Sequence, residues 1–266
     1  MRDASLEAEV AAARAYEALF VPALFGQWAA SVVDAAQVST GERVLDVACG
    51  TGVLAREAQR RTGPAGHVTG LDPGVGMLAV AKELAPTVDW RQGMAESMPF
   101  ADASFDAVVS QFGLMFMDRE RAIRELLRVL KPNGRMVVAV WDAVERIPAY
   151  AAEIGLLERL AGRRAADALR APFVLGNQAL LAEAFNNAGV GSVTISTRTG
   201  VACFPSIRVM VEADLRGWLP VMGVHLAEDE IGRILQAAED VLSSYVAADG
   251  RVTFDVPAHI VSARKP

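Results

Sequence analysis

The chain has 266 residues, enough to bury a large core as one α/β domain with an appended subdomain. Its net charge of −6 and pI of about 5.2 disfavour nucleic acid as the substrate, because such binding needs a concentrated basic surface. Hydrophobic residues make up 52% of it, yet no apolar run approaches the ~18 residues of a membrane helix, and its two cysteines show no pairing or metal-ligand spacing. We therefore expect a cytoplasmic protein without a membrane span or a metal site.

Residues 5–37 predict two helices that are interrupted at Val21-Pro22, since proline disrupts the interior of a helix. Their apolar faces carry aromatic residues, among them Phe25 and Trp28. We expect residues 1–38 to form an N-terminal helical cap.

The segment 44–52 predicts a strand, a tight turn and a helix N-terminus. It reads VLDVACGTG and is followed by a segment of helical period at 53–58. This arrangement brings backbone N–H groups close to a ligand. Residues 50–55 also fit the weakly specific G-x-G-x-x-G/A pattern of dinucleotide loops. The carboxylate of Asp46 would lie awkwardly near a pyrophosphate, however, and it suits a ligand with a cationic group such as an α-ammonium.

A second apolar strand ends at Asp72, twenty positions after Gly52. An acid at the tip of this strand can accept hydrogen bonds from both ribose hydroxyls of an adenosine, which NAD also contains. The alternative is that Asp72 caps the helix that begins near Val75. Met77, one turn into that helix, either covers one face of an adenine or packs in the core.

A buried strand at 105–109 ends at the polar residues Ser110 and Gln111. Residues just past the carboxyl ends of the strands line the ligand crevice of an open α/β sheet, so we expect both beside the ligand. The apolar segment 112–117, which includes Phe112 and Met115, forms either a wall of this crevice or part of the core alone.

The remaining elements alternate between the sheet and additional helices. Helical spacing at 118–131 leads through a turn at 132–134 into a strand at 135–141. Residues 148–188 suggest two or three helices, and strands are expected at 193–199 and 259–264. The stretch between these strands has helical patterns near 206–218 and 227–247. We read it as a lid that contains Trp218, Met222 and His225.

Four of these segments resemble class I S-adenosylmethionine (SAM)-dependent methyltransferases. Residues 46–52 resemble the D-x-x-x-G-x-G motif of that family, and 130–135 read LKPNGR, like its L-K-P-x-G-R pattern. Residues 90–100, WRQGMAESMPF, resemble the G-D-A-x-x-L-P-F stretch of small-molecule methyltransferases, especially the ubiquinone/menaquinone C-methyltransferase group. With the strand that ends at Asp72, the matches span about residues 40–142 in unbroken order.

The resemblance implies an α/β fold with a Rossmann-like seven-stranded sheet of order 3-2-1-4-5-7-6. Strand 7 is antiparallel, and helices cover both faces of the sheet. The SAM-binding core then comprises 39–200 and 257–266, and 201–256 is the inserted lid over an acceptor pocket. N-terminal helices of such enzymes close over the cofactor and the substrate.

The resemblance also implies a cofactor site. Loop groups hold the ammonium of SAM, and an Asp in the third motif bonds the adenine amino group, but Met94 occupies that position here. Either Glu96 compensates or apolar packing holds the adenine, while the backbone contact from Ala95 remains available. The expected cofactor-binding residues are Asp46, Ala48, Gly50, Thr51, Gly52, Asp72, Pro73, Met77, Met94, Ala95, Glu96, Ser110 and Gln111.

We interpret the chain as a SAM-dependent methyltransferase that produces S-adenosylhomocysteine (SAH). The acceptor is expected to be a small, largely apolar molecule: a phenol, quinol, polyketide or isoprenoid-like compound. The residues expected to bind it are Phe25, Trp28, Phe112, Met115, Trp218 and Met222, with His225 as a candidate base and Gln111 as a second catalytic candidate.

Several alternatives stay open. Transfer to O, C or N fits the sequence equally well, and the chain is expected to be a monomer or a homodimer. An NAD-dependent oxidoreductase would share the glycine loop and Asp72. A non-catalytic SAM-binding module would keep the core, but it leaves the long apolar lid unexplained.

Overall fold

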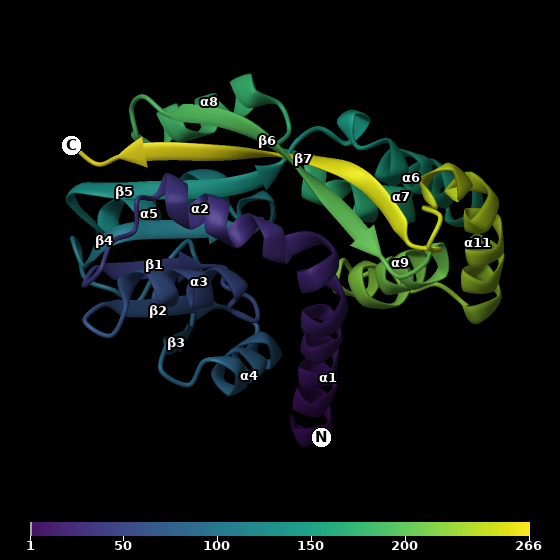
Figure 1. Cartoon of the computed structure of the whole chain (residues 1–266), viewed down its shortest axis with the longest axis horizontal. Coiled ribbons are helices and arrows are strands. Elements are labelled where there is room, and N and C mark those ends of the chain that lie inside the picture. Colours follow the sequence, from purple (N-terminus) through teal and green to yellow (C-terminus); the bar gives the residue numbers. More distant parts are fainter. Residues whose placement is uncertain (1) are drawn as a thin grey trace.

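The computed structural model describes residues 2–266, with side chains from residue 6 onward. A seven-stranded sheet of order β3-β2-β1-β4-β5-β7-β6 runs through the molecule (Figure 1). Strands β1 to β5 are parallel, and β7 is antiparallel to both β5 and β6. The expected strand order and the reversed seventh strand are confirmed. The strands are β1 (Arg43–Val47), β2 (His67–Asp72), β3 (Asp89–Gln92), β4 (Phe105–Gln111), β5 (Leu130–Trp141), β6 (Thr194–Phe204) and β7 (Val252–Arg264).

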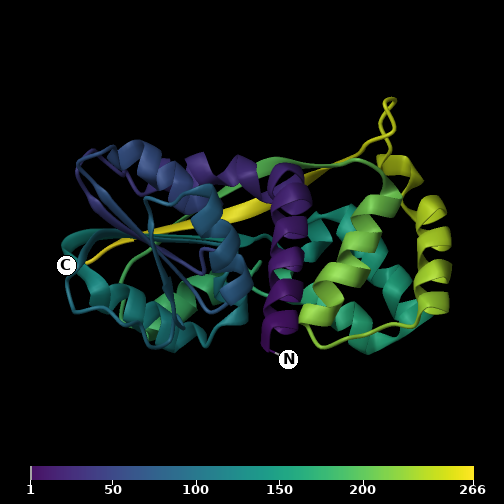
Figure 2. The same cartoon turned by 90° about the horizontal axis from the view of Figure 1, so that it is seen from below.

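The central strands are apolar along almost their whole length because helices cover both faces of the sheet. In β1 every residue after Arg43 is buried, and the end of β5 from Met136 to Trp141 is buried as well. Parallel strands enclosed on both faces have this composition. In Figure 2, α2 and α3 lie over one face and α5 and α8 over the other. These helices are α2 (Ala29–Ala35), α3 (Val53–Thr62), α5 (Arg119–Val129) and α8 (Gln178–Asn187); α4 (Val75–Leu84) follows β2.

The register of the sheet places the carboxyl ends of β1, β2 and β4 next to one another. Val47 of β1 pairs with Leu71 of β2, and Asp46 pairs with Val109 of β4. The loops that follow these strands are therefore neighbours, as open α/β sheets require of a ligand crevice.

The N-terminal helices lie against these strand ends. Helix α1 (Arg2–Phe20) continues through a π-helical turn, η1 (Val21–Phe25), and a short 3₁₀ turn, η2 (Gly26–Trp28), into α2. The break at Val21-Pro22 lies where the sequence predicts it. Helix α1 packs on α4 so closely that a Cβ added to Gly76 would lie 2.5 Å from the backbone of Glu9. Figure 2 shows α1 between the sheet and a second, helical lobe.

The segment Leu6–Ala35 is long and apolar enough to cross a membrane by length and composition, with a mean hydropathy of 1.3. This differs from the sequence-based expectation that no stretch qualifies. It is weak evidence for a span, because a core helix of a soluble protein passes the same test and 39% of the window is buried in the structure.

The helical lobe is built around the extended ends of β6 and β7 (Figure 1). Their pairing runs from Thr194↔Ser262 to Phe204↔Val252, which makes both strands longer than the sequence predicts. Helix α6 packs on both α7 and α11, so residues 148–170 share this lobe with 201–256. The division into cap, core and lid stays a prediction. The lobe contains α6 (Pro148–Ala161), α7 (Arg163–Arg170), α9 (Ile207–Ala213), the π-helical η6 (Asp214–Trp218), α10 (Leu219–Val221), α11 (Glu228–Val241) and the 3₁₀ turn η7 (Ser243–Tyr245). Further short 3₁₀ turns are η3 (Leu114–Phe116), η4 (Val144–Arg146) and η5 (Ala171–Phe173).

Candidate cofactor and acceptor site

The glycine loop after β1 has positive φ angles, which residues other than glycine rarely adopt. Ala48, Gly50 and Gly52 have φ angles of 56°, 54° and 87°. A Cβ on Gly52 would lie 2.3 Å from the ring of Trp90, whereas a Cβ on Gly50 would meet nothing within 4 Å. Gly52 is thus required by packing, and Gly50 borders open space in which a ligand can approach the backbone.

Asp46 is a buried carboxyl for which the described residues provide no partner. Its side chain is 1% exposed, and neither oxygen accepts a hydrogen bond. Burial raises the pKa of Asp46 well above its usual range, the backbone N–H of Ala55 and the charge of Arg56 partly oppose this rise, and the charge of Asp72 adds to it. A buried polar group without a partner is costly. The site therefore favours a ligand that brings a positive charge and hydrogen-bond donors, as the ammonium of SAM does.

Asp72 joins the tip of β2 to the glycine loop. Its Oδ2 accepts a hydrogen bond from the N–H of Gly50 at 2.9 Å, and its Oδ1 accepts one from the N–H of Gly74 at 2.8 Å. Gly74 is itself the N-cap residue of α4, so Asp72 holds the turn that leads into the helix. A carboxylate has about four lone-pair sites, so both oxygens can still accept the ribose hydroxyls. The two predicted roles of Asp72 are compatible.

Helix α1 contributes two residues that the sequence analysis did not assign to the site. Glu17 accepts hydrogen bonds from the hydroxyl of Thr51 and from Arg56, whose Nη2 lies 2.7 Å from Glu17 Oε1. Burial raises the pKa of Tyr16, and the charges of Glu17, Asp72 and Asp46 raise it further. No local pattern could reveal these contacts, because they join residues more than 25 positions apart in the chain.

The adenine end of the predicted site is partly polar despite the substitution at Met94. Met94 is 54% exposed and pairs with Ser97 in a short antiparallel bridge. Glu96 Oε1 accepts a hydrogen bond from the N–H of Asp118 at 2.9 Å, while its Oε2 is buried and has no partner among the described residues. Glu96 therefore retains an acceptor that could serve the adenine amino group. Ala95 is buried next to Glu96 in the chain, and Met77 is half-buried on α4. The carbonyl of Pro73 accepts a hydrogen bond from the side chain of Gln92.

An aromatic cluster closes the crevice past the end of β4. Phe112 has a φ of 56°, unusual for a bulky residue, and its ring stacks on Trp141 with centroids 3.6 Å apart. Phe25 and Trp28 pack on both rings. The side chain of Gln111 donates to the carbonyl of Phe25 at 3.1 Å and so ties the cap to the sheet.

The expected acceptor residues do not all lie together. Trp218 of η6 packs on Phe116 just past β4, with ring centroids 5.2 Å apart, and Met222 is half-buried nearby in sequence. Phe112, Trp28 and Met115 are packed into the core in this structure, and Ser110 Oγ beside them is buried without a partner among the described residues. His225 is exposed on the segment between α10 and α11. Its role as a base stays a prediction.

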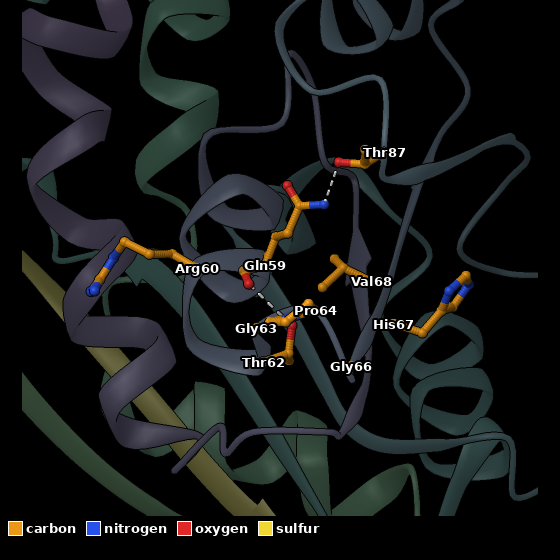
Figure 3. A pocket seen from close by; sticks show the side chains of 9 residues that line it. All are labelled: Gln59, Arg60, Thr62, Gly63, Pro64, Gly66, His67, Val68 and Thr87. Atoms are coloured by element: carbon orange, nitrogen blue, oxygen red, sulfur yellow. Dashed lines mark hydrogen bonds between the residues drawn. The ribbon is translucent and has the colours of Figure 1, made fainter.

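A hollow of about 540 Å³ lies elsewhere, at the amino end of β2 (Figure 3). It is bordered by the last turn of α3 and by Gly63 to Val68, and Gln59 donates to Thr87 across it at 2.7 Å. Strand amino ends lie on the opposite side of the sheet from the ligand crevice, so this hollow is separate from the predicted site.

Comparison with known proteins agrees with this geometry. Residues 45–138 match a methyltransferase domain family. The chain is 46% identical over 114 residues to a demethylmenaquinone methyltransferase from Renibacterium salmoninarum, covering 42% of this chain and 47% of the relative. It is 40% identical over 118 residues to a ubiquinone/menaquinone biosynthesis C-methyltransferase from Pseudomonas paraeruginosa, covering 42% and 46%. The chain thus aligns with about half the length of these relatives.

The fold also resembles a solved phosphoethanolamine N-methyltransferase 2 from Haemonchus contortus in complex with phosphomonomethylethanolamine and SAH. The TM-score is 0.59 at 19% identity, over 96% of this chain and 57% of the other. This likeness concerns the fold. Residues 45–138 thus match a methyltransferase domain family, and the chain has the Rossmann-like sheet that its motifs predict.

Proposed function

We propose that the chain transfers a methyl group from SAM to a ring carbon of a small hydroxylated aromatic acceptor of the quinol type. The observation that carries the cofactor assignment is the buried, unpartnered carboxyl of Asp46. The relatives named as menaquinone and ubiquinone C-methyltransferases support the acceptor class. We infer that the protein works in the cytoplasm.

Each residue at the strand ends is assigned to one part of the cofactor. Asp46 binds the ammonium group, the open space beside Gly50 lets the amino-acid part approach the backbone, and Asp72 accepts hydrogen bonds from the ribose hydroxyls. We assign the adenine amino group to the free Oε2 of Glu96, which replaces the acid expected at Met94. Glu17 on α1, which accepts a hydrogen bond from the hydroxyl of Thr51, closes the site from the other side.

SAM, when bound, supplies an electrophilic methyl group, so the protein has mainly to align the acceptor and exclude water. The stacked rings of Phe112 and Trp141 and the neighbouring Phe25 provide a dry wall for this. A cationic donor and an anionic quinol neutralise each other during transfer, which an apolar surrounding favours. Transfer to a quinol carbon forms one C–C bond, leaves the sulfur its electron pair and releases one ring proton, and an already acidic quinol needs no dedicated base.

The test combines binding and product analysis. Calorimetry should show SAH binding that Asp72→Ala or Gly50→Arg weakens strongly, whereas NADH should not bind. Incubation with SAM and 1,4-naphthohydroquinone should give a product one methyl group heavier, with the methyl on a ring carbon. Absence of SAH binding at millimolar concentration refutes the cofactor assignment. Methyl transfer to phenols or amines, but not to the quinol carbon, refutes the acceptor assignment.

A further inference from the structure

Gly113, which lies just past the end of β4, is in close contact with the glycine loop that follows β1. A Cβ added to Gly113 would lie 2.6 Å from the Cβ of Ala48, whereas an ordinary contact begins at 3.4 Å. The backbone of Gly113 has a φ of −109° and a ψ of −32°, which residues with side chains also adopt. Glycine is therefore needed at this position because of the space beside Ala48, and its backbone conformation does not require it.

The loop on the Ala48 side of this contact is held by its neighbours. Ala48 has a φ of 56°, which is unusual for a residue other than glycine. The N–H of Cys49 donates to the carbonyl of Leu71 at 3.1 Å. A Cβ on Gly52 would lie 2.3 Å from the ring of Trp90, which packs under the same loop. A movement of Ala48 away from the contact would disturb these interactions.

The segment on the Gly113 side is held as firmly. The N–H of Phe112 donates to the carbonyl of Ala139 on β5 at 2.9 Å, and the Phe112 ring stacks on Trp141. Phe112 also has a φ of 56°, and such a backbone persists only where the surroundings enforce it. The contact between Gly113 and Ala48 thus joins two fixed segments. One carries the predicted donor site, and the other forms the predicted acceptor wall.

Two further side chains lie at the position that a Cβ on Gly113 would occupy. The Cε of Met117 would lie 3.2 Å from it, but this flexible side chain can move aside, whereas the Cβ of Ala48 is fixed to the backbone. The Oγ of Ser110 would lie 3.5 Å from it, and this hydroxyl is buried without a hydrogen-bond partner among the described residues. Unsatisfied polar groups of this kind are expected at functional sites, so the contact borders the space of the predicted ligands.

We propose that Gly113 is a positioning residue that sets the spacing between the donor loop and the acceptor wall. The inference rests on the proposed function and adds to it a residue that acts through Ala48. To reach an ordinary contact, the two Cβ atoms must move apart from 2.6 Å to at least 3.4 Å. A misplacement of about 1 Å can slow a reaction roughly 100-fold, because transfer needs donor and acceptor in line at close range.

The test measures SAH affinity and the rate of methyl transfer from SAM to 1,4-naphthohydroquinone with both ligands saturating. Gly113→Ala should slow transfer about 10- to 100-fold. SAH follows the loop that binds it, so its affinity should fall by less than about threefold. Gly134→Ala is the matched control, since its Cβ would lie 2.8 Å from the carbonyl oxygen of Lys131, just before the paired part of β5 and away from the strand carboxyl ends. This control should leave the rate of transfer unchanged.

A double-mutant cycle assigns the effect to the contact itself. Ala48→Gly removes the Cβ that a side chain at residue 113 would meet. Adding Gly113→Ala to the Ala48→Gly variant should therefore change the rate of transfer by less than about threefold. This rescue distinguishes spacing across the contact from any other consequence of a side chain at residue 113.

The outcomes separate the two proposals. If the unaltered protein binds SAH but transfers no methyl group to naphthohydroquinone, the acceptor assignment fails and this inference fails with it. If it transfers the group and Gly113→Ala is equally fast, or equally slowed in both backgrounds, only the positioning role is refuted. A loss of SAH affinity as large as the loss of rate also refutes it, because the residue then serves donor binding alone.

The cycle also covers a Gly113→Ala variant that does not fold, as judged by circular dichroism. Ala48→Gly is then compared with Ala48→Gly/Gly113→Ala, in which the steric conflict is absent. Similar rates support the proposal, and a rate that is more than about tenfold lower in the double variant refutes it.

Discussion

Replacing Asp46 by Asn should affect binding and stability in opposite directions. In the free protein burial raises the pKa of this carboxyl, whereas the unfolded chain ionises it freely at neutral pH, so an amide that cannot ionise should raise the free energy of unfolding. In the complex the same change removes a charge-assisted hydrogen bond to the ligand ammonium. Such bonds contribute about 1.5–3 kcal/mol, so SAH should bind roughly 10- to 150-fold more weakly.

Two measurements check this prediction. Thermal unfolding without ligand should give a higher midpoint for Asp46→Asn than for the unaltered protein, and calorimetry should give the weaker SAH affinity. Asp255→Asn, at an exposed position on β7, is the control and should change neither quantity. An Asp46→Asn variant that binds SAH as tightly as the unaltered protein would refute the ammonium role. A lower unfolding midpoint would show that the carboxyl is satisfied in the free protein.

Three further predictions concern the loop, the cap and the lobe. Gly52→Ala should lower the free energy of unfolding by about 2–4 kcal/mol, measured by urea titration, because the new Cβ would lie 2.3 Å from Trp90 at a positive φ. Glu17→Gln should weaken SAH binding roughly fivefold and speed tryptic cleavage of α1, because it weakens the contact of α1 with the glycine loop. Burial raises the pKa values of Glu153 on α6 and Asp214 on η6, so in the folded state both keep protons that the unfolded chain releases above pH 3.8–4.5. Stability from these groups falls as pH rises above that range, and Glu153→Gln/Asp214→Asn should flatten the decline in urea midpoint between pH 5 and 8.

Each of these predictions has a matched control. Gly50→Ala has the same strained backbone but no steric clash, so it should destabilise less than Gly52→Ala. Glu7→Gln, exposed on α1, should leave SAH binding and proteolysis unchanged. Glu158→Gln, at an exposed position of α6, should not alter the pH profile. Equal destabilisation by the two alanine variants, unchanged SAH binding in Glu17→Gln, or an unaltered slope in the double variant would contradict the respective interpretation.

The positions of most strands could be predicted from local patterns, because each strand and its following loop carry their own signal, whereas the strand order and the antiparallel direction of the last strand were implied by the family resemblance. The apolar run before the glycine loop, the run ending at Asp72 and the antiparallel last strand all occur in the structure in the expected order. Strand lengths at β6 and β7 could not be predicted in the same way. Their outer halves extend beyond the sheet into the helical lobe, where packing, rather than alternation of residues, determines how far the pairing continues.

The candidate site likewise has residues that the sequence could locate and contacts that only the structure shows. Asp46, Asp72, Ser110 and Gln111 could be located from sequence because strand ends meet wherever parallel strands are in register. The contacts of Glu17 with the glycine loop depend on how α1 packs across α4, which no local pattern encodes.

The sequence by itself determined the cofactor class, since the glycine loop with Asp46, the strand that ends at Asp72 and the later motifs occur together in the order that resembles SAM-dependent methyltransferases. Only the tertiary structure decided which residues close the site and which acids stay unpaired. Burial and hydrogen-bond satisfaction are properties of the packed chain. The free oxygens of Glu96, Glu153 and Asp214 become visible only when every neighbour is in place. The ordered motifs therefore identify the donor, and the packed structure shows which acids a ligand would have to satisfy.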